Sequence, residues 1–230
     1  MILGLMDGLN LAHGEMFIVG AYVGWTVFVR PDTFVDLLAP LLLTAVGFVL
    51  LPAWRVWLQK VPLLQKNRRI WPWLALILGT GLLWVAYARF PLAIWNPEVY
   101  SESPITYSLA LSQDNLVLNT VRPPAGWPLG LLGTLLGGSL LALALAGFGL
   151  RQQAGRISSH IGRGPFITAG ILLALGLVTF FINSNITNFL LGISTTARFF
   201  VAMGVATGLG FVLGGLIEVA LIRPLYDRPI

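Results

Sequence analysis

The residues best suited to chemistry lie together near the N-terminus, in the segment GLNLAHGE at positions 8–15. Asn10, His13 and Glu15 are polar or ionisable, yet an apolar run follows at once, so each would be costly inside a membrane-spanning segment. The glycines of this segment would allow a break, and a helix that starts near Gly14 would carry Glu15 in its first turn, where the helix dipole favours an acid. We therefore predict a broken helix, and broken helices whose ends face a cavity are a recurring device of transport proteins. The alternative is a polar cytoplasmic start of an ordinary span.

Catalytic and metal-binding interpretations find little support. His13 and Glu15 are two positions apart, roughly 200° around a helix, so they do not form a same-face metal pair. The chain has no cysteine, and the motifs HExxH, GxSxG and GxxxxGK[ST] are absent. We predict that the chain is not an enzyme and that it holds no metal and no cofactor.

Glycine rows of the small-xxx-small type form the second feature, and they let helix backbones approach closely in lipid. The rows are Gly20 with Gly24 in the first span, and Gly204, Gly208, Gly210 and Gly214 in the last. The simpler interpretation is helix packing within the chain. The sharper one is a subunit interface, or a helix that slides during gating.

Glu218 is the acid that lies deepest in a well-defined apolar segment, and a charge near the bilayer centre costs roughly 2.5 to 3.5 kcal/mol on insertion scales. Arg223 follows at i+5, so a direct ion pair needs local unwinding, which Pro224 would provide. The sequence leaves a structural ion pair and a functional role at a cytoplasmic turn equally open.

The elements that must position these residues are membrane helices. The 230 residues are 57% hydrophobic and 10% charged, against about a quarter charged in soluble domains. Stretches of about 20 apolar residues predict about six spans in an all-α bundle. They are Leu9–Val29, Thr33–Trp54, Ile70–Phe90, Trp127–Leu150, Pro165–Ile182 and Phe199–Ile222.

Charge patterning sets the expected orientation. The net charge of +5 is held in short basic clusters between apolar runs, which indicates membrane topology and no nucleic-acid partner. Most Lys and Arg residues fall inside if the loop at 55–69 is cytoplasmic, and alternation then places both termini in the cytoplasm and the loop at 91–126 outside.

Two segments, NLAHGEMFIVGAYVGW at 10–25 and GGLIEVALIRPLYDRP at 214–229, resemble the inner-membrane permeases of branched-chain amino acid ABC transporters. The first is similar to the family's Asn, His-Gly and Gly-Ala-Tyr steps, and the second to its Ile-Glu, Arg-Pro-Leu and Arg-Pro sequence. In the family, about one loop and one helix separate these motifs, whereas here about four extra spans lie between them. An even number of spans keeps both motifs in the family orientation. The family's helix before the first motif is reduced to residues 1–7 at most, and its second half, which contacts the ATPase, has no counterpart after residue 230, so we expect an incomplete or split permease.

This resemblance implies a domain organisation. Residues 1–32 would form the broken helix and first span, residues 33–184 an inserted four-helix unit with a periplasmic loop at 91–126, and residues 185–230 the Gly-rich last span with its cytoplasmic end. By the same resemblance, Asn10, His13, Gly14 and Glu15 would shape a broken helix beside the translocation path.

The function that the resemblance implies is that of a permease subunit, or its N-terminal portion, in an importer of branched-chain amino acids or related small polar solutes. Its partners would be ATP-binding subunits, a second permease subunit and a periplasmic solute-binding protein, with lipid around it in the bacterial inner membrane. The alternative is a non-transporting membrane scaffold or assembly subunit. A membrane-embedded enzyme comes third, and would require His13 or Glu218 for turnover.

Overall fold

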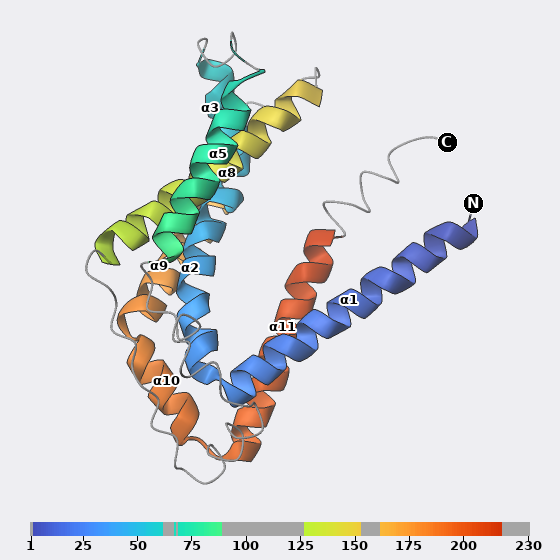
Figure 1. Ribbon diagram of the computed structural model, residues 1–230, viewed down its shortest axis with the longest axis vertical. Helices are drawn as coiled ribbons and strands as arrows, with labels where there is room; N and C mark the ends of the chain where they lie inside the picture. Colours follow the sequence, from blue (N-terminus) through green and yellow to red (C-terminus); the bar gives the residue numbers. More distant parts are fainter. Residues whose placement is uncertain (1, 62–66, 68, 89–126, 153–161, 218–230) are drawn as a thin grey trace. The chain divides into compact units, whose positions relative to one another are not determined.

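The computed structural model describes residues 2–61, 67, 69–88, 127–152 and 162–217, and each secondary-structure element in these ranges is a helix. Figure 1 shows the helices in chain order: α1 (Ile2–Val29), α2 (Pro31–Val49), α3 (Leu51–Lys60), α5 (Trp71–Tyr87), α8 (Trp127–Gln152), α9 (Gly164–Phe181), α10 (Asn183–Gly192) and α11 (Thr195–Ile217). The prediction of an all-α protein is confirmed for this part of the chain.

Four of the described helices are long and apolar enough to cross a membrane, which indicates an integral membrane protein. They cover Pro31–Val49, Pro128–Phe148, Gly164–Phe181 and Thr195–Gly215. Two shorter apolar helices cover Gly14–Val29 and Trp71–Tyr87. The prediction of about six spans with both termini in the cytoplasm stays a prediction.

Proline marks where several helices begin. Pro31 is the first residue of α2, and α3, α5 and α9 each carry a proline at their first or second position. Proline is tolerated there because its missing N–H would have no partner within the helix, and its fixed φ suits the first turn. The same property ends the preceding segment: the predicted span Thr33–Trp54 is interrupted at Leu50, since Pro52 cannot donate to the carbonyl of Phe48.

A helix that the sequence analysis did not predict lies between the last two spans. α10 has the sequence NSNITNFLLG, and its asparagines and threonine carry low helix propensity and interrupt the apolar pattern. Tertiary contacts stabilise it instead, because Thr187 and Leu190 are buried.

The chain divides into two compact units, and the division falls inside α2 and α10. Of the described residues, unit 1 holds 2–34 and 187–217, and unit 2 holds 35–88 and 127–186. The sequence predicts these boundaries at 32/33 and 184/185. The interpretation of the middle region as an insertion stays a prediction.

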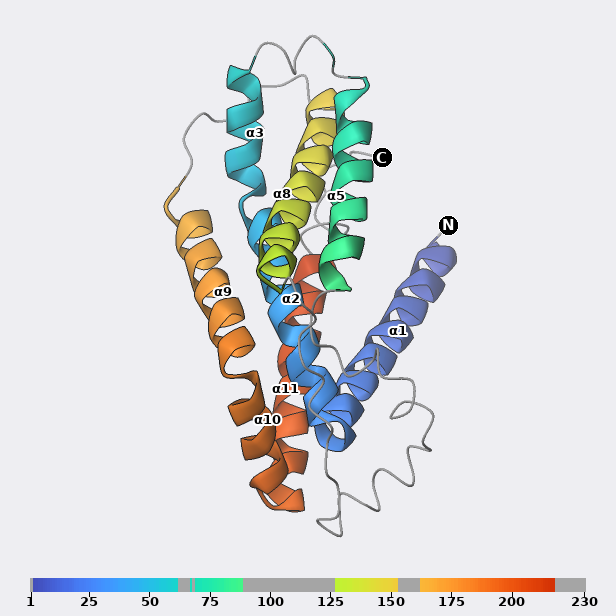
Figure 2. The same ribbon diagram turned by 60° about the vertical axis from the view of Figure 1, so that its left-hand side comes forward.

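Unit 2 is built around α8, which packs along α5 and against α3 (Figure 2). Glycine allows the close approach: a Cβ on Gly137 would lie 2.7 Å from Cγ of Leu83, and one on Gly79 would lie 3.1 Å from the carbonyl oxygen of Gly137. The crossing of α2 and α8 is closer still, because a Cβ on Gly47 would lie 2.4 Å from the carbonyl carbon of Gly138. Only glycine fits at such a crossing without movement of the backbone.

Polar groups join the helices of unit 2 at two further places. The hydroxyls of Thr44 and Tyr87 lie 2.8 Å apart, and both lie within hydrogen-bond distance of the Pro40 carbonyl, at 2.8 and 3.4 Å. Asn183 Nδ2 donates to Asp36 Oδ1 at 2.7 Å, which joins the first residue of α10 to α2. Buried polar groups in a membrane helix need such partners, because neither lipid nor apolar side chains can supply them.

Unit 1 is an antiparallel pair of long helices, α1 and α11 (Figure 1). Phe28 near the end of α1 meets Phe199 near the start of α11, with ring centroids 6.3 Å apart. At the other end of the pair, a Cβ on Gly214 would lie 3.5 Å from Cε of Met16. This antiparallel arrangement brings together segments from opposite ends of the chain.

Candidate functional site

The N-terminal polar segment lies inside one continuous helix, since α1 runs without interruption from Ile2 to Val29. The predicted break near Gly14 is therefore absent from the structure. Glycine raises the free energy of a helix by only about 1 kcal/mol relative to alanine and keeps its N–H donor, so without a proline the hydrogen-bond ladder continues. Asn10 and His13 lie in the N-terminal half of α1, and Gly14 and Glu15 are exposed.

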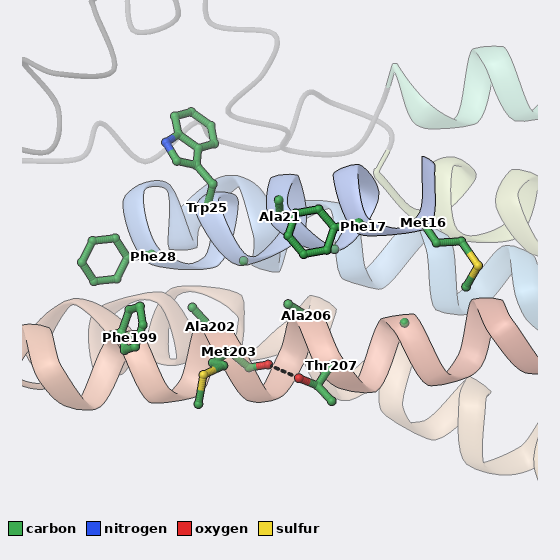
Figure 3. Close-up of a pocket in the computed structure, with 13 residues that line it drawn as sticks. Met16, Phe17, Ala21, Trp25, Phe28, Phe199, Ala202, Met203, Ala206 and Thr207 are labelled. Carbon is green, nitrogen blue, oxygen red and sulfur yellow. Dashed lines mark hydrogen bonds between the residues drawn. The ribbon is translucent and has the colours of Figure 1, made fainter. Parts of the chain in front are cut away.

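An apolar groove runs between α1 and α11 within unit 1, and its volume is about 590 Å³. We call it the α1–α11 groove. Figure 3 shows Ala202 and Ala206 pointing from α11 toward α1, with Phe28 and Phe199 at one end. Its lining consists of Met16, Phe17, Gly20, Ala21, Gly24, Trp25, Phe28, Phe199, Ala202, Met203, Ala206, Thr207 and Gly210.

The lining offers little hydrogen bonding. Thr207 is the hydroxyl residue of the groove, and its Oγ1 already donates to the Met203 carbonyl at 2.8 Å, as the dashed line in Figure 3 marks. The groove therefore suits aliphatic or aromatic groups better than a polar molecule. Glu15 precedes the lining residue Met16 in α1, but it is exposed and is not among the lining residues.

The glycines singled out in the sequence divide into two groups. Gly24 and Gly214 meet neighbouring atoms, since a Cβ on Gly24 would lie 3.4 Å from Cβ of Ala206. A Cβ on the others would meet nothing within 4 Å, and these are Gly20, Gly204, Gly208 and Gly210. Packing within the described chain therefore does not explain the second group. Their predicted role as a subunit interface stays a prediction.

The end of the α1–α11 pair near Phe28 and Phe199 carries buried charge. Arg30 and Asp32 are 6% and 9% exposed, and the guanidinium donates from Nε to Oδ1 at 3.1 Å and from a terminal nitrogen to Oδ2 at 2.9 Å. This two-bond geometry is the strong form of a charge pair. Asp32 also lies in the first turn of α2, where the helix dipole favours an acid.

Arg198 of α11 binds the end of α10. It is 3% exposed and donates to the carbonyls of Leu190 at 2.7 Å, Leu191 at 2.6 Å and Ile193 at 3.3 Å. The last carbonyls of a helix lack hydrogen-bond donors within the helix and carry negative partial charge. A guanidinium there donates the missing hydrogen bonds and compensates the charge. Arg198 thereby fixes the turn between α10 and α11.

The sequence analysis missed these polar contacts. Arg30, Asp32, Asp36 and Arg198 are not among the residues that the sequence pattern singles out. A charged residue at or inside the end of an apolar segment could have indicated these contacts, because such a residue needs a polar partner. Nothing in the sequence names that partner when it lies 147 positions away, as Asn183 does from Asp36.

Comparison with known proteins identifies no family for this chain. No protein-family model, curated protein or solved structure matches this chain. The resemblance to the permeases rests on the two segments quoted from the sequence.

Two further predictions concern the metal site and the cytoplasmic turn. Within the described residues, no group of three or more His, Cys, Asp or Glu side chains could hold a metal ion. Glu218, Arg223 and Pro224, the residues of the predicted cytoplasmic turn, lie outside the described residues.

Proposed function

We propose that the chain is a permease subunit, or the N-terminal portion of one, in an ABC importer that moves branched-chain amino acids or related small polar solutes. It would act in the bacterial inner membrane as a multi-pass protein. ATP-binding subunits, a second permease subunit and a periplasmic solute-binding protein would complete the importer.

The pairing of α1 with α11 carries this proposal. The segment 10–25 lies in α1, and the described beginning of the segment 214–229 lies in α11, so both parts of the resemblance belong to one unit. Segments from distant parts of the sequence that form one helix pair are expected if they build one functional element. The described residues between them, 35–88 and 127–186, pack as a unit of their own, which is compatible with an insertion.

The chemistry of the α1–α11 groove is compatible with a substrate that has a branched aliphatic side chain. Its lining is almost entirely apolar, so it would accept an isobutyl or isopropyl group without leaving a buried polar atom unpaired.

Uptake of labelled leucine by membrane vesicles containing the full assembly tests the proposal. Gly20→Leu is the informative variant, because a Cβ at Gly20 meets nothing within 4 Å and the longer side chain would fill the groove. Gly81→Leu is its matched control, since Gly81 on α5 is equally open and lies in unit 2. We expect uptake to fall with Gly20→Leu and to persist with Gly81→Leu. Unchanged uptake after deletion of the gene would refute the proposal.

A second candidate function is a membrane scaffold or assembly subunit, and the open glycines favour it. Gly204 and Gly208 are one helical turn apart on α11, and neither meets another helix within the described chain. Small residues allow a partner helix to approach closely in lipid. This candidate predicts recovery of the chain with another membrane complex and without an ATPase, whereas the permease proposal predicts recovery with an ATPase.

A further inference from the structure

One end of unit 2 gathers basic and indole side chains from α3, from the start of α5 and from the turn that precedes α5. Leu58 of α3, 2% exposed, and Ala146 of α8, fully buried, form a cluster to which Trp54 and Trp71 pack. The cluster holds the end of α3 and the start of α5 beside α8, as Figure 2 shows.

Three basic residues lie at this end, because each is within two positions of a residue of this cluster. Arg55 follows Trp54, Lys60 lies two residues after Leu58, and Arg69 lies two residues before Trp71. Lys60 and Arg69 are exposed, and Arg55 is half-buried. We call Arg55, Lys60 and Arg69 the basic end of unit 2.

No acid accompanies this charge. Every charged residue between positions 37 and 97 and between 115 and 217 is Lys or Arg, so α3, α5 and α8 contain no carboxylate. The acid of unit 2 in the described chain, Asp36, lies near the beginning of α2, and α3 follows the far end of that helix. The basic end therefore carries positive charge that the described part of unit 2 does not neutralise.

The indoles place this charge at the level of lipid headgroups. Trp57 is 48% exposed and Trp73 is 54% exposed, although both make edge-to-face contacts, Trp57 with Trp54 and Trp73 with Phe148. Tryptophan gathers at the boundary between hydrocarbon and water, where the ring is apolar and the N–H stays hydrated. An acidic protein partner would need the charge but not the exposed indoles.

We infer that the basic end of unit 2 is a binding site for anionic phospholipid headgroups, with Arg55, Lys60 and Arg69 facing the phosphate and Trp57 and Trp73 lying among the upper acyl chains. Basic surfaces between membrane helices bind anionic headgroups in this way. This inference does not depend on a transport function.

Native mass spectrometry of the purified full chain in detergent tests the inference, with phosphatidylglycerol and phosphatidylcholine titrated separately. We expect phosphatidylglycerol to bind at least about tenfold more tightly, and the triple variant Arg55→Gln, Lys60→Gln, Arg69→Gln to lose that preference. The matched control Arg55→Lys, Lys60→Arg, Arg69→Lys keeps the charge and is expected to keep the preference. Equal binding of the two lipids, or a preference that survives the triple neutral variant, would overturn the inference.

A second measurement needs no variant. Lys60 of the natural protein is exposed, so an amine-acylating reagent reaches it in detergent. We expect phosphatidylglycerol to slow this acylation, and phosphatidylcholine or soluble glycerol phosphate to leave it unchanged. If glycerol phosphate alone protects Lys60, the ligand is a free phosphate and not a lipid. If labelling is equal under all conditions, the basic end is not a binding site.

Discussion

The α5–α8 contact in unit 2 and the α1–α11 contact in unit 1 are both made by glycine-bearing apolar helices, yet they differ in closeness. In unit 2, a Cβ on Gly137 would clash with Leu83 at 2.7 Å. In unit 1, a Cβ on Gly24 would reach an ordinary contact distance of 3.4 Å from Ala206, and a groove remains beside it. The same residue type thus serves close packing in one unit and leaves open surface in the other.

The largest expected effect comes from enlarging a glycine at the crossing of α2 and α8. In Gly138→Leu, the Cβ alone would lie 2.6 Å from the carbonyl oxygen of Thr44, and a backbone atom cannot rotate away. We expect a loss of more than about 3 kcal/mol of stability, the upper end for overpacking. Thermal unfolding in detergent measures it, with Gly81→Leu as the open-site control. Equal melting of the two variants would show that unit 2 is not closely packed there.

Arg198→Gln should give the next largest effect, because unit 1 is held at its end by hydrogen bonds of a buried charge. The variant loses donors to the carbonyls at the end of α10, and we expect a cost of about 2 kcal/mol. Hydrogen exchange of the α10 amides is the direct measurement, and should speed up there before it does in α8. Arg198→Lys, which keeps the charge but not the planar fork, should fall between the natural protein and Arg198→Gln.

Gly24→Leu tests the looser contact. Its Cβ would meet Ala206 at 3.4 Å and the Ala202 carbonyl oxygen at 3.7 Å, and the groove can take up part of the larger side chain. We expect a cost of about 1 kcal/mol, below that of Gly138→Leu. The comparison of the two melting temperatures is the measurement. A larger loss for Gly24→Leu than for Gly138→Leu would reverse the contrast between the two units.

Gly208→Ala is expected to cost the chain alone no stability. Nothing lies within 4 Å of the added methyl group, and alanine favours a helix over glycine by about 0.5 to 1 kcal/mol, so the isolated chain should be slightly stabilised. Co-purification gives the second readout: if a partner helix covers Gly208, its recovery should fall while the melting temperature does not. A clear loss of stability in the isolated chain would place an intrachain contact at this position.

Much of the fold could be predicted from the sequence, as the helices of two regions illustrate. The expected span Pro165–Ile182 agrees with α9 to within one residue at each end, because a long apolar run flanked by Arg163 and Asn183 has clear limits. α10 could not be predicted in the same way, since its asparagine-rich sequence is stabilised by Arg198 and by buried contacts from other helices.

The candidate site was less predictable than the fold. Its helices were expected, but the groove depends on how α1 and α11 are rotated about their axes, and no single residue encodes that rotation. The predicted break at Gly14 was wrong because polar residues indicate only that a segment is costly in lipid. They do not show that its backbone hydrogen bonds are broken.

The sequence by itself determined that this chain forms apolar helices suited to a membrane and that its basic residues lie between them. These are local properties, since the transfer of a segment into hydrocarbon depends on the sum over its own residues. Only the tertiary structure decided that Gly137 is covered and Gly208 is open, that Asn183 meets Asp36, and that α1 and α11 enclose a groove. These properties depend on which faces of two helices meet, and that is decided by the packing of all the neighbouring side chains together.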